Sequence, residues 1–522
     1  MDYQVYAVNS KSLEKELAQN IGNAFDFLPY SVAFVTFFAV ANGFKLNSFR
    51  FSKPFVACFG IINAFVSIAS ACGALFWFGC PWQAINLASL FLLLGVGIDD
   101  AFVMLGSYHR ICLEHPNESK SEIFRITYEE AAISITITSL TNICSFAIGA
   151  ILPSFDTVSI FCLYTAVGLV YVYLSTLFFF GAVLAYSHSI TWHCNSRIIS
   201  LCQVKDAKPL SHLFFEEIVL PFVSNRLMKT LVLLAWIASI VFSCYHLQFI
   251  KEGLEQSRIG KDIIFTFISK DNFFSFSLFI FKARKDTTTF NYFHAEDTYF
   301  RNLNYRVHVV INEPLDFSQR SVQDNVSDFV KNLSKLDYLD SQYNLTESWL
   351  SQYQISQLSF EDFFQVNAKT PLPLNVHKIE DQKMLTRYMV QTTDIKDAME
   401  EAEMVQSLRN LETPFNVTFF HPYFPYFDQF LQVQPNTMKC LASGIVLVLL
   451  ITLLLIPDRQ AGFILMLAII SIMLLISQAM FLLDIYLDVI SMMTLIMSVG
   501  FSVDFCVHLS HHFYSRYVLQ IM

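Results

Sequence analysis

Residues 91–105, FLLLGVGIDDAFVML, place two adjacent carboxylates, Asp99 and Asp100, in the middle of an apolar segment. Glycines precede them at positions 95 and 97. An aspartate near the centre of a bilayer costs about 2.5–3.5 kcal/mol on insertion scales, so such acids usually face a bundle interior or a water-filled cavity. The segment therefore predicts a membrane-spanning helix with a polar function at its centre.

The whole chain has the composition of a polytopic α-helical membrane protein. Of its 522 residues, 54% are hydrophobic and 15% are charged, and 53 are Phe. The formal net charge of −10 argues against nucleic acid as a partner. Runs of about 20 apolar residues, long enough to cross a hydrocarbon core of about 30 Å, predict nine spans: 27–44, 54–78, 84–108, 131–152, 158–186, 231–249, 438–456, 461–483 and 487–508.

Charge and glycosylation signals agree on the orientation of these spans. Short connections rich in Lys and Arg, such as 45–53 and 197–229, should be cytosolic by the positive-inside rule. The long connection 250–436 then lies on the other side. It holds four of the five Asn-x-Ser/Thr sequons, which we expect to carry sugar: Asn325, Asn332, Asn344 and Asn416. The fifth, Asn117, falls on the cytosolic side and should stay unmodified.

A repeat becomes visible when the chain is shifted against itself by 405 residues. The shift aligns INLASLFLLLGVGIDDAFVML (85–105) with ISMMTLIMSVGFSVDFCVHLS (490–510), and 54–78 with 459–483. Gly95 then meets Gly500, and Asp99 meets Asp504. Corresponding loops keep the same sidedness, which indicates a parallel-repeat bundle about an axis along the membrane normal. Transporters with such internal repeats bind their substrates at the repeat interface.

The acids favour an ion relay at that interface. Gly95 lies four residues before Asp99, on the same helix face, so a neighbouring helix can approach closely beside the carboxylate. In the repeat partner, Gly500, Asp504 and His508 follow one another at steps of four. A carboxylate and an imidazole one turn apart can exchange a proton. The expected relay residues are Asp99, Asp100, Asp504 and His508, and the glycines expected at the helix contacts beside them are Gly95, Gly97 and Gly500.

The alternative interpretation is structural. The acids would then be polar groups that hold helices together, and the histidines, including His511 and His512, would anchor the helix end at the headgroups. In the relay, Asp99 is expected to share a proton or cation with its repeat partner Asp504, because nearby carboxylates resist simultaneous ionisation. Asp99→Asn should then be more damaging than Asp100→Asn.

These motifs carry a family resemblance. GVGIDDAFVML (95–105), the SKP loop (52–54) and VGFSVDFCVHLSHHF (499–513) resemble the Patched-related (Patched domain-containing) proteins of the resistance-nodulation-division superfamily. Residues 27–186 are similar to their sterol-sensing domain, and NVTFFHPYFPYFDQF (416–430) is similar to the end of their second extracellular domain. The resemblance implies twelve spans, two extracellular α+β domains, and movement of sterols or other lipids coupled to a cation gradient.

The chain departs from that pattern in three places. It begins at what resembles the last stretch of the first extracellular domain and stops after the tenth span, so we expect it to be truncated at both ends. The Phe-rich stretch 273–293 is interpreted as an insertion or, alternatively, as a hydrophobic lip on a lipid path. The expected layout is an extracellular remnant (1–26), a sterol-sensing-like domain of five helices (27–186), a cytosolic linker (187–230), a helix opening the second half (231–249), an extracellular α+β domain (250–436), three helices of the second repeat (437–513) and a cytosolic tail (514–522).

The exposed domain is expected to be α+β. YRVHVVIN (305–312) and FNVTFF (415–420) have the pattern of strands, and 318–336 places apolar residues at helical spacing. Neither this domain nor the rest of the chain has the motif of a hydrolase triad, a P-loop, a metal site or a dinucleotide fold, so we expect neither an enzyme nor a cofactor.

Three functions remain open at this point. The first is a transporter of sterol or another lipid, driven by a proton or a monovalent cation. The second is a sterol-sensing binding protein without transport, with a protein ligand as a further candidate partner of the exposed domain. The third is a truncated, non-functional fragment. In each case the chain is expected in the plasma membrane or in endosomal vesicles.

Overall fold

The computed structural model describes residues 54–83, 85–115, 118–187, 219–251, 303–333, 383–393, 397–455 and 459–521, with short pieces within 29–38, 291–299, 335–356 and 376–378 and at 217, 253 and 395. They form two compact units, one of membrane helices and one of strands with shorter helices. Helix α16 (Phe424–Leu455) contributes to both, and the division falls between Gln434 and Pro435. Most of the Phe-rich stretch 273–293 lies outside the described residues.

The prediction of a polytopic helical membrane protein is confirmed. The described residues form seven helices that are long and apolar enough to cross a membrane: Val56–Trp77, Asn86–Cys112, Ser121–Ile151, Asp156–Ser187, Arg226–Phe249, Phe424–Leu454 and Gly462–Leu482. A shorter apolar helix, Val489–Asp504, opens α18 (Val489–Ile521). The first expected span, 27–44, is helical at the positions that are described, 29, 30 and 32–38. Helices are required here because hydrocarbon offers backbone groups no water to bond.

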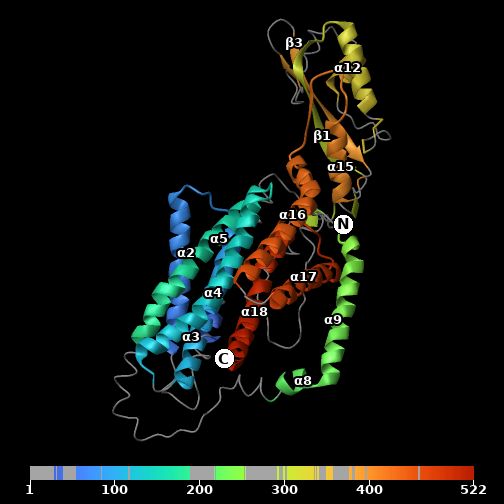
Figure 1. Ribbon diagram of the computed structural model, residues 1–522. Helices are drawn as coiled ribbons and strands as arrows, with labels where there is room; N and C mark the ends of the chain where they lie inside the picture. Colours follow the sequence, from blue (N-terminus) through green and yellow to red (C-terminus); the bar gives the residue numbers. More distant parts are fainter. Residues whose placement is uncertain are drawn as a thin grey trace, which may run out of the picture. The chain divides into compact units, whose positions relative to one another are not determined.

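In the membrane unit, the two halves of the repeat pack against each other (Figure 1). The helices of the first half are α2 (Pro54–Trp77), α3 (Asn86–Glu114), α4 (Lys120–Ile151) and α5 (Asp156–Ser175), followed by the π-helix η1 (Thr176–Phe180). Those of the second half are α8 (Leu220–Ser224), α9 (Arg226–His246), the 3₁₀ turn η3 (Leu247–Phe249), α16, α17 (Arg459–Leu482) and α18. Helix α4 packs against α3 and α5 and also against α18. Its Ile137 shares a buried cluster with Val448, Leu465 and Val499 of the second half.

The repeat extends to the backbone geometry of the helix ends. Helices α2 and α17 each have 24 residues and occupy corresponding positions under the 405-residue shift. Each is closed by a residue with positive φ at equivalent positions, Gly79 (75°) and Asp484 (51°). The same closing hydrogen bond follows in both, from Cys80 N to Leu75 O (3.0 Å) and from Ile485 N to Met480 O (2.8 Å). This is the pattern of a Schellman C-cap, in which glycine is favoured at the position with positive φ. In the second copy, Asp484 takes that position.

The other unit is the expected α+β domain. Its sheet has four antiparallel strands in the order β2 (Val376–Lys378), β3 (Lys383–Thr393), β1 (Leu303–Asp316) and β4 (Val417–Phe420). The helices are α12 (Arg320–Leu333), α13 (Trp349–Ser356) and α15 (Ala398–Arg409). The strands predicted in 305–312 and 415–420 and the helix predicted in 318–336 are confirmed. The sequence did not predict β3, because its residues KMLTRYMVQTT mix polar and apolar side chains without a sustained alternation.

The three sequons of this unit that the structure describes are exposed, as glycosylation requires. Asn325 and Asn332 on α12 are exposed, and so is Asn416 beside β4. Asn344 and Asn117 lie outside the described residues. We expect sugar on the four sequons of 250–436 and none on Asn117. Peptide mass spectrometry before and after glycosidase treatment measures this directly, and sugar on Asn117 would contradict the orientation of all the spans.

The stability of this unit should depend on pH through His421. Burial, and then the nearby His308, lower the pKa of His421 to about 4. Its ring contacts the Tyr305 ring, and its Nδ1 accepts a hydrogen bond from the Tyr423 backbone N–H at 3.3 Å, which requires an unprotonated Nδ1. The unfolded chain, with a histidine pKa of about 6.5, binds more protons than the folded one below that pH. Stability that is fully present above about pH 6.5 is therefore lost as the pH falls toward 4.

Lowering the pH from 7 to 5 should reduce the free energy of unfolding of this unit by about 1–2 kcal/mol. Hydrogen–deuterium exchange of β1 and β4 peptides in the solubilised full chain measures the loss. His421→Phe keeps an aromatic ring and removes the titrating group, so its exchange should change less between the two pH values. Comparing the two proteins at the same pH cancels the intrinsic pH dependence of exchange. An equal change in both proteins would contradict the assignment to His421.

Candidate functional site

The two acids of α3 differ in their surroundings. Asp100 is buried, with 3% of its surface exposed, whereas Asp99 is exposed. Consecutive residues lie about 100° apart around a helix, so the two side chains point in different directions. Within the described part of the chain, Asp100 Oδ2 is buried without a hydrogen-bond partner. A buried, unsatisfied carboxylate oxygen is costly when the group is ionised, so the surroundings of Asp100 favour its neutral form over a bare charge.

The acid of the second half, Asp504, is bound by an amide from the first half. Asn142 of α4 is 1% exposed, and its Nδ2 donates to Asp504 Oδ1 at 3.0 Å and to Oδ2 at 2.9 Å. Asp504 itself is half-buried on α18. The contact joins residues 362 positions apart in the sequence. It explains how helices α4 and α18 are held together at the level of the acids.

The glycines next to these acids allow close helix contacts. A Cβ at Gly500 would collide with Asn142 Oδ1, so only glycine leaves room for the amide at this position. A Cβ at Gly97 would lie 2.9 Å from the Ala64 Cβ of α2. Gly95 is half-buried. Small residues at helix contacts are typical of membrane bundles, where they let backbones approach.

The acids from the two halves lie within electrostatic reach of one another. The charges of Asp504 and Asp99 both act on Asp100, and that of Asp99 acts on Asp504. The sequence pointed to Asp99 as the more important acid of α3 because of its repeat register. Burial instead favours Asp100, since a buried carboxylate depends most on what neutralises it. The side chains of His508, His511 and His512 lie outside the described residues.

Asn142 is the residue of this site that the sequence analysis missed. Its span contains an unusual run of polar residues, SITITSLTNICS (134–145), and this run is the pattern from which a polar site on the helix could have been predicted. Several of these hydroxyls bond only to carbonyls of their own helix, as Thr141 does to Ile137 O (3.0 Å) and Thr138 O (2.8 Å). Within the described residues, no group of three or more His, Cys and acidic side chains is placed to hold a metal ion.

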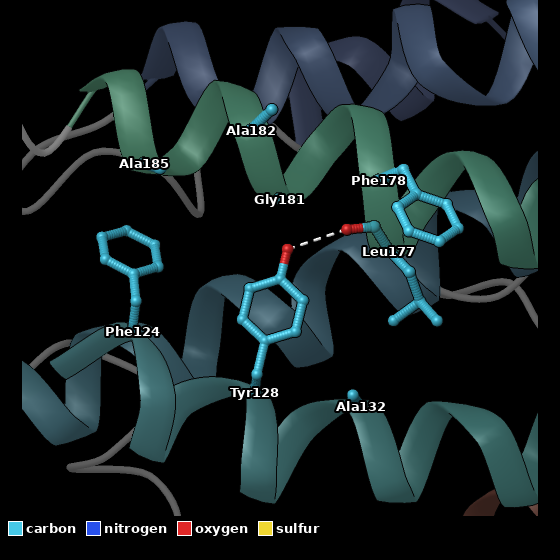
Figure 2. Close-up of a pocket in the computed structure, with 8 residues that line it drawn as sticks. All are labelled: Phe124, Tyr128, Ala132, Leu177, Phe178, Gly181, Ala182 and Ala185. Carbon is cyan, nitrogen blue, oxygen red and sulfur yellow. Dashed lines mark hydrogen bonds between the residues drawn. The ribbon is translucent and has the colours of Figure 1, made fainter. Parts of the chain in front are cut away.

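A second feature is an open groove of about 530 Å³ between α4 and the helix that follows α5 (Figure 2). It is lined by Phe124, Tyr128, Ala132, Leu177, Phe178, Gly181, Ala182 and Ala185. These side chains are apolar except for the Tyr128 hydroxyl, which donates to the Leu177 carbonyl oxygen at 2.8 Å. A Cβ at Gly181 would collide with the Tyr128 hydroxyl. The groove is therefore shaped for an apolar molecule, with one hydroxyl at its wall.

The π-helix η1 forms one side of this groove, and a side chain of α2 bonds to its beginning. Asn63 of α2 donates from Nδ2 to Thr176 Oγ1 at 3.1 Å and accepts a hydrogen bond from the Ser175 hydroxyl. Single π-helical turns within α-helices are rare and occur frequently at functional sites. The polar contacts to Asn63 and Tyr128 fix this turn, and with it the position of Leu177 and Phe178 in the groove.

Comparison with known proteins agrees with the resemblance read from the sequence. The family model described as Patched SSD matches residues 28–186. Patched-related protein 9 from Caenorhabditis elegans is 26% identical over 542 aligned positions, which cover 98% of this chain and 59% of that protein. A Niemann-Pick type C1-related protein from Plasmodium falciparum is 34% identical over 148 positions, 28% of this chain and 10% of that protein.

The fold also agrees with that of a solved structure. The cryo-EM structure of the hedgehog release protein Disp from the water bear Hypsibius dujardini matches with a TM-score of 0.61 and 14% identity, covering 94% of this chain and 60% of that one. The chain thus spans about 60% of the length of Patched-related protein 9 and of Disp. The resemblance of the chain to Patched-related proteins is confirmed.

Proposed function

We propose that this Patched-related integral membrane protein moves sterol or another lipid, and that a proton or monovalent cation drives the movement by binding among Asp100, Asp504 and Asp99. One observation carries the proposal. The carboxylate of Asp100 is buried, its Oδ2 has no hydrogen-bond partner among the described residues, and it lies within electrostatic reach of Asp504, which comes from the other half of the repeat. A purely structural polar contact is expected to satisfy both oxygens of a buried acid, so the unsatisfied Oδ2 favours a site for a proton or cation.

The coupling follows from electrostatics. Carboxylates close together in a poorly solvated place repel one another when ionised, and a bound proton or cation relieves that repulsion. The halves can then pack more closely around the site. A gradient across the membrane loads and unloads the site from different sides, so it favours alternation between the two arrangements. The residues that sense the ion are therefore on α3 and α18, and α4 lies between these helices and the groove.

The lipid side of the proposal rests on the groove between α4 and η1. Its apolar lining suits a sterol ring system or an acyl chain, and it lies within the segment that matches the Patched sterol-sensing domain. Helix α4 contributes both Tyr128 to the groove and Asn142 to the acid cluster. One helix thus provides a physical connection between lipid binding and ion binding.

Reconstitution tests the proposal. The purified chain in proteoliposomes should transfer a fluorescent sterol between donor and acceptor vesicles faster when a pH or sodium gradient is imposed. An ionophore that collapses the gradient should return the rate to that of protein-free vesicles. Separate pH and sodium gradients identify the ion. A rate independent of any gradient would refute ion coupling.

The second candidate is a sterol-sensing binding protein without transport, and the groove is the observation that favours it. In that case a photoreactive sterol should label the groove equally in the wild type and in acid-cluster variants, and no gradient should change lipid movement. Labelled peptides from 124–132 or 177–185 would locate the bound sterol in either case.

A further inference from the structure

A buried amide connects the sterol-sensing half to the acid of the second half. Asn142 donates from one nitrogen to both carboxylate oxygens of Asp504, at 3.0 and 2.9 Å. Two such contacts to one carboxylate satisfy it as an anion, because N–H donors stabilise the charged form of an acid. In this arrangement the amide is matched to Asp504 in its ionised state.

The other end of the amide has no partner. Asn142 Oδ1 is buried, and no hydrogen bond reaches it within the described part of the chain. It lies against Gly500, one turn before Asp504 on the same helix, where any side chain would displace it. An unsatisfied buried carbonyl costs about 1–3 kcal/mol. The observed orientation of the Asn142 amide therefore carries a cost, and a change of charge at Asp504 can favour another orientation.

An amide is suited to both charge states of a neighbouring acid. Its nitrogen donates and its oxygen accepts. When Asp504 binds a proton, its new O–H needs an acceptor, and the amide of Asn142 provides one by rotating about its Cβ–Cγ bond. A leucine has the same size but neither group, and an aspartate has no donor when ionised. Asparagine is thus among the few side chains of this size that can bond to both states.

We propose that Asn142 is a positioning residue that senses the charge of Asp504 and transmits it to α4, and so to the sterol-sensing helices. The inference rests on the proposed function, because it assigns the connection between the ion site and the lipid groove. Among the described residues, the charged groups that act on Asp504 are those of α3, Asp99 directly and Asp100 as its repelling neighbour. His508 follows one turn later on α18, and its side chain lies outside that description.

The test is a thermal-melting comparison of the full chain in detergent at pH 8 and pH 5. Asn142→Leu should lower the melting temperature by about 3 °C more at pH 8 than at pH 5, because only an ionised Asp504 loses its charge-assisted bonds. In an Asp504→Asn background, this pH-dependent difference should vanish. Thr141→Val is the matched control, since its buried hydroxyl bonds only to α4 carbonyls, so any loss should be equal at both pH values.

Equal losses for Asn142→Leu at both pH values, or a difference that persists without Asp504, would overturn the inference. The melting comparison does not require transport, so it decides the role of Asn142 even if the wild type shows no gradient-driven lipid movement. In the transport assay, Asn142→Leu should remove the response to the gradient while leaving sterol labelling of the groove unchanged. Loss of labelling as well would indicate general misfolding rather than loss of sensing.

Discussion

Replacing Asp100 or Asp504 with asparagine should reduce gradient-driven lipid movement by about 5–150-fold, the range expected when a coupling free energy of about 1–3 kcal/mol is lost. Asparagine keeps the size of the side chain and removes the charge that a proton or cation neutralises. Asp100 is buried with its Oδ2 lacking a partner among the described residues, and Asp504 is half-buried and bound by Asn142, so both charges depend strongly on their protein surroundings. Asp99 is exposed, and Asp99→Asn should have the smaller effect.

The measurement is the proteoliposome transfer assay, with each variant at several external pH values. Asp156→Asn is the matched control, because Asp156 is an exposed acid in the first turn of α5, away from the cluster. Sterol labelling of the groove should persist in the acid variants, which separates lost coupling from lost binding. A larger loss of transport in Asp99→Asn than in Asp100→Asn would instead support Asp99 as the main ion-binding acid of α3, as the repeat register predicts. Wild-type rates in Asp504→Asn would exclude a coupled mechanism.

Gly181→Ala should close the lipid groove. The new methyl group would occupy the position of the Tyr128 hydroxyl, so Tyr128 must swing out and give up its bond to Leu177 O. Overpacking of this kind costs about 1–3 kcal/mol of stability. Photoreactive sterol labelling of peptides from 124–132 and 177–185 should fall by about 5-fold or more, the change that about 1 kcal/mol of lost binding produces.

The matched control for this variant is Gly106→Ala on α3. A Cβ at Gly106 meets nothing within 4 Å, so the substitution makes the same chemical change in open space and should leave labelling intact. Adding Tyr128→Phe to Gly181→Ala removes the hydroxyl that collides with the methyl group and should restore part of the labelling. Undiminished labelling in Gly181→Ala would place the sterol elsewhere.

The amino-acid sequence by itself determined the membrane class, most of the spans and the repeat. Each depends on local properties: hydropathy over about 20 residues decides whether a segment crosses a bilayer, and residues at matching positions reveal a duplication. The duplication read from the sequence extends to the ends of the helices. Helices α2 and α17 begin and end at corresponding residues, and the same hydrogen bond closes both. In the α+β unit, alternation and helical spacing were sufficient for β1, α12 and β4, while β3 has too weak a pattern.

Only the tertiary structure decided which groups meet. Asn142 and Asp504 are 362 residues apart, and no local pattern indicates that α4 packs on α18. The repeat register matched Asp99 to Asp504, yet burial depends on which helices surround α3, and they enclose Asp100 instead. The groove likewise depends on a contact between helices. The Tyr128 hydroxyl of α4 donates to the Leu177 carbonyl oxygen, and the absence of a side chain at Gly181 leaves room for it. The sequence determines which residues enter the membrane, because hydropathy acts through each segment alone; their partners are decided by packing, because contacts form between segments far apart in the chain.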